Sequence, residues 1–280
     1  MSQITARFQN IYNLERHRFE IIGCGAIGSF TTMNLARAGA DKFMLWDPDT
    51  VDAVNIGVQH YALEHIGASK VKMLRKQIYS VNPHAKVTMR RQKYQSFPFR
   101  HPFYGYYSRG LSRYYKFDKK CFVIIGIDNM SGRKQISNLL WNNDNCHYYR
   151  YDTWIIDARM GSETFMYSNW RLYTDEEIQQ LNELLNRNTT SRNDVYNIQN
   201  RAKQRFLNAY EQEWYSDEDG NPEPCNARST NYCASMAGAF INNAIRKICD
   251  LKSPTSTKIT FNFPSLQLSA DTDYSRILNI

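Results

Sequence analysis

The sequence predicts an α/β fold, a doubly wound and mostly parallel sheet with helices on both faces. Apolar runs of strand length alternate with helical patterns through residues 20–159, and strands separated by helices are typical of parallel βαβ units. The first strand also leads directly into a glycine-rich turn at 23–28, which is typical of Rossmann-like sheets. We therefore expect residues 1–280 to form a single domain built on such a sheet.

Each expected element of the first half is an apolar run or a periodic pattern bounded by turn residues. Strands are expected at 20–23, 42–47, 85–90, 121–128 and 154–159. One helix follows the glycine turn to about Ala38, and Gly39 is typical of a helix end. A second helix covers 69–81 and stops before Pro83, because proline cannot continue a helix.

The second half is predicted to be more helical. An insertion rich in aromatic and basic residues occupies 92–120, and a helical crossover segment occupies 175–228. One apolar helix face in the crossover segment comprises Val195, Ile198, Ala202, Phe206 and Tyr210. A C-terminal helix and strand are expected within 229–280, with the helix beginning near Ser229 and Thr230, whose hydroxyls suit an N-cap. The apolar face of that helix is predicted to comprise Met236, Phe240, Ile241, Ala244, Ile245 and Ile248.

Composition excludes several classes of protein. Hydrophobic residues make up 42% of the chain and charged residues 22%, which is typical of a globular protein. No apolar run approaches the roughly 20 residues of a membrane span, and the first twenty residues are polar, so we expect a cytoplasmic protein without a membrane segment. The six cysteines fall singly, which argues against a zinc ribbon and a disulfide framework. The net charge of +8 suits nucleotide phosphates, an acidic partner or nucleic acid without ranking them.

The glycine turn predicts a nucleotide phosphate site. Gly23, Gly25 and Gly28 form a G-x-G-x-x-G between a strand and a helix. This spacing permits a tight turn and a close approach of the backbone to a phosphate, which the helix N-terminus attracts. Asp47 lies nineteen residues past Gly28, at the end of the second strand, where a carboxylate bonds ribose hydroxyls. Because NAD and ATP sites both use such a carboxylate, these residues leave the nucleotide open.

The residues that follow resemble the ThiF/MoeB/HesA family, adenylation domains related to ubiquitin-activating enzymes. That family carries D-x-D-x-V at the second strand, then N-x-x-R-Q, then G-x-x-K opening the next helix, then N-P, and Asp-Asn after the fourth strand. The corresponding residues here are Asp47, Asp49, Val51, Asn55, Gln59, Gly67, Lys70, Asn82, Pro83, Asp128 and Asn129, followed by Arg133. The resemblance covers residues 15–160 well and the remainder loosely.

The resemblance implies a ThiF-like fold and an ATP- and Mg²⁺-dependent adenylyltransferase. Its substrate would be the C-terminal carboxylate of a ubiquitin-like protein or peptide, and the protein would be a homodimer. Attack on the α-phosphate of ATP builds negative charge that cations and donors must stabilise. The residues implied to bind ATP are Gly23, Gly25, Gly28, Asp47, Asp49, Asn55, Gln59 and Lys70, with Asp128 as the magnesium ligand.

One element departs from the family pattern. Val58 stands where the family has the Arg of N-x-x-R-Q, and that Arg contacts ATP phosphates in relatives. Relatives also take an arginine from the N-terminal helix of a dimer partner, for which Arg7, Arg16 and Arg18 are candidates here. Arg159, just after the fifth strand, is the other candidate ligand of the phosphates.

The cysteines differ in what they predict. Many relatives transfer the activated carboxyl group to a cysteine ahead of the last long helix, and Cys225 has that position. A helix N-terminus and Arg228 would favour its thiolate, but an inert loop thiol stays an alternative. Cys233 lies inside the helix and is predicted to be a core residue, and Cys24 a small filler in the glycine turn.

Several alternatives stay open at this point. The insertion at 92–120 could stack bases, but Tyr and Arg also favour protein interfaces, so we favour a partner-docking surface over nucleic acid there. The function could instead be that of an NAD-dependent oxidoreductase, of a non-catalytic nucleotide-binding scaffold, or of a tRNA-modifying relative. The sequence names neither the substrate nor the pathway.

Overall fold

The computed structural model describes residues 14–95, 116–140, 151–186, 192–212, 229–250 and 257–270. The strands are β1 (Arg18–Ile22), β2 (Lys42–Trp46), β3 (Lys86–Arg90), β4 (Lys116–Ile125), β5 (Tyr151–Met160), β6 (Thr164–Arg171), β7 (Thr257–Asn262) and β8 (Gln267–Ala270). The α-helices are α1 (Ala26–Arg37), α2 (Lys70–Val81), α3 (Met130–Leu139), α4 (Asp175–Asn186), α5 (Arg192–Glu211) and α6 (Asn231–Asp250). Two short 3₁₀ turns, η2 (Ala53–Asn55) and η3 (Leu63–His65), precede α2.

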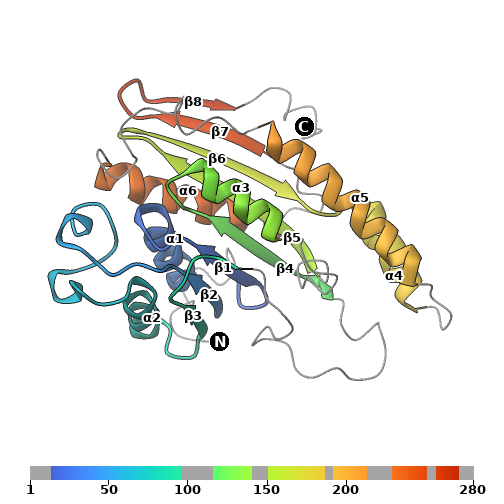
Figure 1. The fold of residues 1–280 in the computed structure, drawn as a ribbon, viewed down its shortest axis with the longest axis horizontal. Helices are drawn as coiled ribbons and strands as arrows, with labels where there is room; N and C mark the ends of the chain where they lie inside the picture. Colours follow the sequence, from blue (N-terminus) through green and yellow to red (C-terminus); the bar gives the residue numbers. More distant parts are fainter. Residues whose placement is uncertain are drawn as a thin grey trace.

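One eight-stranded sheet runs through the molecule in the order β3-β2-β1-β4-β5-β6-β7-β8 (Figure 1). The first five of these strands are parallel. The strand order reverses direction between β1 and β4, and ligands of doubly wound sheets bind at the carboxyl ends of the strands at such a point. The predicted class, a doubly wound and mostly parallel α/β sheet, is confirmed.

The other end of the sheet is antiparallel. β6 pairs with β5, β7 with β6, and β8 with β7, each in antiparallel register. The strand predicted within 229–280 corresponds to β7, whereas β6 and β8 were not predicted. In β6 the buried polar residues Ser168 and Asn169 interrupt the apolar pattern, although Phe165, Tyr167 and Trp170 gave a signal of strand propensity.

Helices cover both faces of the sheet, and each face has its own apolar core. One core joins α1, α2 and α6 to the sheet, and the other joins α3, α4 and α5 to the opposite face. The predicted apolar face of α5 is confirmed, because all five of its residues are buried. No helix in the described part of the chain is both long and apolar enough to cross a membrane.

The predicted face of α6 is wrong at one residue. Met236 is 46% exposed, whereas Ile241, Ile245 and Ile248 are buried. Cys233 and the small residues Ala234, Ala237 and Gly238 complete the buried stripe instead. They do so because α6 packs closely on α1, where a Cβ added to Gly238 would lie 2.9 Å from the Thr31 nitrogen.

Candidate nucleotide-binding site

The glycine turn joins β1 to α1 at the carboxyl edge of the sheet. Gly23 has a φ of +93°, and a Cβ there would lie 2.7 Å from the Gly126 carbonyl oxygen. A Cβ on Gly28 would overlap the Gly23 carbonyl oxygen. Gly25, the residue before α1, is different, since a Cβ there would approach only the Gln59 amide, at 3.8 Å. Gly23 and Gly28 therefore shape the turn, and Gly25 leaves the start of α1 accessible to an anion.

Asp47 connects the end of β2 to this turn. Its side chain is 5% exposed, and its two carboxylate oxygens accept the backbone N–H groups of Cys24 at 2.7 Å and Asp49 at 2.8 Å. Burial raises the pKa of the Asp47 carboxyl, an effect that the nearby Lys70 ammonium partly offsets. Asp47 thus fixes the turn, and the contact of its remaining lone pairs with a ribose stays a prediction.

Lys70 is held beside the turn. It is the first residue of α2, and its Nζ lies 3.1 Å from Asp49 Oδ2. The Lys70 side chain is 9% exposed and that of Asp49 is 60% exposed. The Lys70 backbone N–H also donates to the Asp49 carbonyl at 3.0 Å. Lys70 is therefore a buried, oriented cation rather than a solvated helix lysine, and its counter-ion is on the solvent side.

Tyr61 lies behind the turn, and no sequence signal marked it. Its hydroxyl donates to the Cys24 carbonyl at 2.7 Å, and burial raises its pKa well above the usual range. The Cys24 side chain is fully buried, and its pKa is raised by burial, as expected of a filler residue. Asp47 thus binds the backbone N–H of Cys24 and Tyr61 binds its carbonyl, so the peptide groups on both sides of Cys24 are held in place.

Gln59 is the residue that points to a missing ligand. Its Oε1 is buried and has no hydrogen-bond partner among the described residues, and its Nε2 faces the open side of Gly25. An unsatisfied buried acceptor costs roughly 1–3 kcal/mol, so a hydrogen-bond donor of a ligand or water is expected at Oε1, while Nε2 can itself donate into the open space beside Gly25. The chemistry of these donors, an amide and the N–H groups of a helix start with Lys70 close by, fits phosphate oxygens.

Asn55 has a local role in the same loop. Its Oδ1 accepts the Asp52 N–H at 2.9 Å, and Asp52 in turn caps the turn η2. Val58 donates its backbone N–H to the Asn55 carbonyl at 3.1 Å. Asn82, of the N-P element, is also structural here, because its amide donates to the Ala40 carbonyl at 3.0 Å. The Asn55 amide nitrogen as a phosphate donor stays a prediction.

Asp128 lies on the loop after β4, beside the glycine turn. This loop touches the turn where Gly23 meets Gly126 and the Ile127 side chain. Asp128 is exposed and accepts a hydrogen bond from the Asn129 amide at 2.9 Å, while Asn129 caps α3 through the Gly132 N–H. No three His, Cys, Asp or Glu side chains gather as metal ligands within the described ranges. A magnesium ion on Asp128 would therefore need phosphate oxygens and water as its other ligands.

Two arginines meet at Asp157, behind the Asp128 loop. Asp157, on β5, is 1% exposed and forms an ion pair with Arg133 of α3. Arg133 also donates to the carbonyls of Ile127 and Ala158, the latter at 3.1 Å. Arg159 donates to Asp157 from Nε at 3.0 Å and from Nη2 at 2.7 Å. Arg133 therefore ties the backbone next to Asp128 to β5, and Arg159 as a phosphate ligand stays a prediction.

The sequence-predicted residues thus differ in where they lie. The glycine turn, Asp47, Asp49, Gln59 and Lys70 come together at the carboxyl edge, with the Asp128 loop touching the turn. Arg16 and Arg18 lie at the opposite end of β1, where Arg18 stacks over the Tyr151 ring at 4.9 Å. Arg7, Cys225 and Arg228 lie outside the described residues. Cys233 is buried, and burial raises its pKa to about 12, as expected of a core residue.

The fold is a doubly wound α/β sheet with a glycine turn, Asp47 and Lys70 at its carboxyl edge. A model of the ThiF family matches residues 3–273, so the chain belongs to the ThiF family. It is 32% identical over 80 residues to the tRNA threonylcarbamoyladenosine dehydratase of Bacillus subtilis, a match that covers 28% of this chain and 32% of that protein. It is 35% identical over 80 residues to the ubiquitin-like modifier-activating enzyme 5 of Dictyostelium discoideum, covering 29% of this chain and 20% of the enzyme. The matched stretches thus span about a third or less of these relatives.

Solved structures share the fold at low identity. Escherichia coli MccB aligns with a TM-score of 0.56 at 12% identity, over 96% of this chain and 69% of MccB. PaaA aligns with a TM-score of 0.55 at 15% identity, over 92% of this chain and 64% of PaaA. A complex of MccB with ATP aligns with a TM-score of 0.51 at 13% identity, over 94% of this chain and 65% of that one.

Proposed function

We propose that this protein is an ATP- and magnesium-dependent adenylyltransferase that activates a C-terminal carboxylate. The observation that carries the proposal is the open start of α1 at Gly25, which is faced by a hydrogen-bond donor, the Gln59 amide nitrogen. Membership of the ThiF family and the fold shared with MccB, which was solved with ATP and with MccA, support it. The substrate class proposed is a ubiquitin-like protein or peptide, in keeping with the name of the modifier-activating relative.

Each residue has a distinct task in this reaction. The N–H groups at the start of α1 and the Gln59 amide bind phosphate oxygens, and Asp47 orients the ribose while it fixes the turn. Lys70 places a positive charge beside the phosphates, where its held position costs no reorganisation during the reaction. Asp128 would hold the magnesium ion, which supplies neutralising charge as the substrate carboxylate attacks the α-phosphate and pyrophosphate leaves.

Two further parts of the proposal concern regions beyond this site. Arg16 and Arg18 lie a strand length away from the site in their own chain, so a homodimer is the arrangement in which they could replace the missing arginine at Val58. Cys225 is proposed to accept the activated carboxyl group as a thioester. A Cys225→Ala variant should then keep ATP–pyrophosphate exchange and lose the thiol-sensitive adduct.

The direct test is ATP–pyrophosphate exchange with a panel of peptides and small proteins that end in a carboxylate. The Asp128→Ala variant should lose exchange by about 100-fold or more, because charge stabilisation at the phosphate is lost. Asp194→Ala on the exposed surface of α5 is the matched control and should keep it. Unchanged exchange in Asp128→Ala would overturn the assignment.

One observation favours a second function. The family arginine is absent at Val58, so the fold could bind a nucleotide without using it. Such a scaffold would bind ATP as tightly as an enzyme but show no exchange with any substrate of the panel. An NAD-dependent oxidoreductase would instead bind NADH with a change in its fluorescence.

A further inference from the structure

The positive charge of this chain is concentrated in one stretch. Between Glu64 and Asp118 the sequence contains twelve Lys and Arg and no Asp or Glu. This stretch alone carries more positive charge than the whole chain, whose net charge is +8. The remaining sequence is therefore acidic overall, and the stretch is a distinct electrostatic unit.

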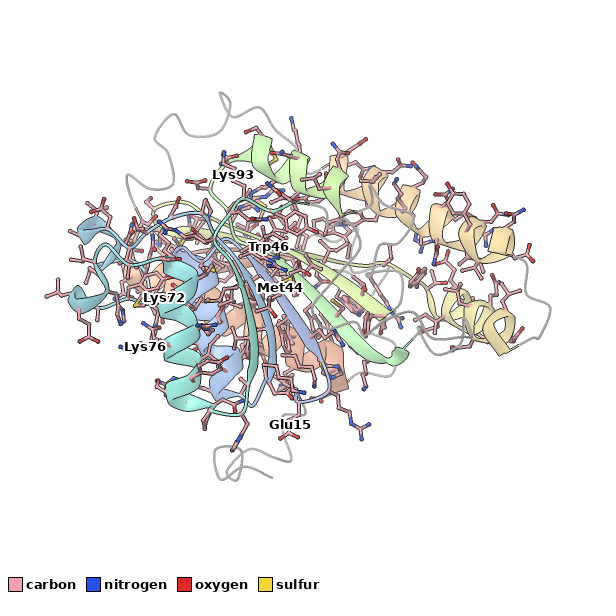
Figure 2. The ribbon with its side chains drawn as sticks, turned by 60° about the horizontal axis from the view of Figure 1, so that its bottom comes forward. Glu15, Met44, Trp46, Lys72, Lys76 and Lys93 are labelled. Atoms are coloured by element: carbon pink, nitrogen blue, oxygen red, sulfur yellow. The ribbon has the colours of Figure 1, made fainter. Side chains whose placement is uncertain are left out.

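The structure places the described part of this stretch at one edge of the molecule. Lys72 and Lys76 are exposed on α2 and lie on its outer side (Figure 2). β3 is the outermost strand of the sheet beside α2. Lys86 at its start is exposed, as are Arg91 and Lys93 just after its end. We call these five residues the α2–β3 basic surface.

None of the five cations makes an ion pair with another described residue. Several basic residues elsewhere in the described part of the chain are paired with a carboxylate. Lys42 pairs with Asp41 at 3.1 Å and Lys120 with Asp152 at 2.6 Å. Lys72 and Lys76, spaced i,i+4 on one helix, repel each other by a few tenths of a kcal/mol. The sequence therefore retains an uncompensated positive surface that a polyanion would neutralise.

Protection of the sheet edge explains only part of this surface. Charged residues on an edge strand discourage pairing with another chain, and Lys86 on β3 and Arg91 just after it fit that role. Lys72 and Lys76 project from a helix, where they protect no edge. A second reason for positive charge is therefore needed along α2.

The chemistry of the surface favours nucleic acid over a protein or a membrane. Lysine is depleted at protein interfaces, but it is a common ligand of backbone phosphates. The one large exposed ring on this helix, Tyr79, has Arg75 6.0 Å from its centroid, and both groups can stack on bases. The apolar residues of α2, such as Val71, Leu74 and Ile78, are buried in the core, so the helix has no apolar face to insert into a lipid bilayer.

We propose that the α2–β3 basic surface binds the phosphate backbone of a nucleic acid. This function goes beyond the adenylation proposed above and does not depend on it, because none of the five residues belongs to the nucleotide site. Lys70, at the start of the same helix, is directed to Asp49 instead. A nucleic acid on this surface would lie next to the site without occupying it.

The test is fluorescence anisotropy of the full chain, without ATP, against a labelled single-stranded RNA and a labelled DNA duplex. With five phosphate contacts, RNA affinity should fall by about 100-fold between roughly 50 and 200 mM salt. The variant Lys72→Glu/Lys76→Glu/Lys93→Glu should weaken binding by a similar factor at low salt. The control Arg201→Glu/Lys203→Glu/Lys247→Glu, on α5 and α6, changes the net charge equally and should keep the affinity within about twofold.

Three results would overturn the proposal. The wild-type chain could fail to bind either probe at low salt. The control variant could lose as much affinity as the α2–β3 variant, which would show a net-charge effect only. Vesicles containing phosphatidylserine could bind through the same three lysines more tightly than the nucleic acids do. Circular dichroism checks that both variants are folded, and Asp128→Ala should keep nucleic-acid binding even where exchange is lost.

Discussion

Two buried aspartates on β5 make similar contacts at opposite ends of the strand. Asp152, near the amino end, accepts hydrogen bonds from Lys120 at 2.6 Å and Arg171 at 2.8 Å. Asp157, near the carboxyl end, accepts bonds from Arg159 and Tyr210 and pairs with Arg133. Both carboxylates are at most 2% exposed. Each therefore neutralises two cations at a low-dielectric position.

The two clusters differ in what their arginines hold. Arg171 extends from Asp152 to Asp175 at the start of α4, at 2.7 Å, so this cluster joins two elements of the frame. Arg133 extends from Asp157 to the carbonyl of Ile127, the residue before Asp128. The same ion-pair chemistry thus serves stability at one end of β5 and, in our interpretation, the position of the proposed magnesium ligand at the other.

The largest expected effect is common to both clusters. Asp152→Ala and Asp157→Ala each leave two largely buried cations without their carboxylate, which costs about 3–5 kcal/mol of unfolding free energy. Urea denaturation followed by circular dichroism measures it. A cost below about 1 kcal/mol in either variant would show that its ion pairs are solvated. The two clusters would then not be equivalent buried ion-pair clusters.

Of the two clusters, only the Asp152 cluster has a neighbouring histidine among the described residues, His17, that should make the free energy of unfolding depend on pH. His17 accepts the Lys120 N–H on Nδ1 at 3.1 Å, and burial, with Lys120 nearby, lowers its pKa from 6.5 to about 4. Between these two pKa values, His17 is therefore protonated in the unfolded chain and neutral in the folded chain. Stability from this group is present above pH 6.5 and is lost as the pH falls, by about 2 kcal/mol at pH 4.5.

The control is His17→Asn, whose amide oxygen can accept the same N–H. Denaturation at pH 7 and 4.5 should show a smaller loss in this variant than in the wild type, by that same amount. An equal loss in the two proteins would place the acid-sensitive group elsewhere.

A matched pair of arginine variants separates the two roles. Arg133→Lys and Arg171→Lys keep the charge but lose the planar fork of donors, so each should cost about 1–2 kcal/mol of stability. Only Arg133→Lys should also weaken Mg·ATP binding or exchange, by roughly tenfold, since it releases the backbone beside Asp128. If the two substitutions changed Mg·ATP binding and exchange equally, Arg133 would only stabilise the fold.

The smallest expected effect is at Tyr210. Its hydroxyl donates to Asp157 at 3.1 Å from α5, and Tyr210→Phe removes this bond without changing the packing. The loss of stability should be about 1 kcal/mol, with Mg·ATP affinity unchanged. A loss of ATP affinity in this variant would instead extend the positioning role from β5 to the crossover helices.

The comparison also shows what the sequence could predict. The glycine turn, Asp47 and Lys70 belong to local patterns of strand, turn and helix, so their positions followed from spacing. The Asp157 cluster joins residues from α3, β5 and α5, up to 53 positions apart, and no local pattern reports such a contact. Tyr61 was missed for the same reason, because only the folded chain brings its hydroxyl to the Cys24 carbonyl.

Errors elsewhere had physical causes of their own. The helical period placed Met236 on the buried face, but close packing of α6 on α1 selects Ala234, Ala237 and Gly238. The polar residues of β6 interrupt the apolar pattern although the strand is buried, and the Asn169 amide nitrogen, for example, donates to the Tyr167 hydroxyl at 2.7 Å. Apolar periodicity alone cannot indicate which polar groups are paired in the folded protein.

The central claim is that the open side of Gly25 receives the phosphates of ATP. A structure of this chain with ATP and magnesium tests it most directly. Our account predicts phosphate oxygens against the start of α1, a hydrogen bond donated by Gln59 Nε2 to one of them, Lys70 beside the phosphates and the metal on Asp128. Phosphates bound elsewhere, with no hydrogen bond from Gln59 Nε2 to them and Asp128 without metal, would contradict it.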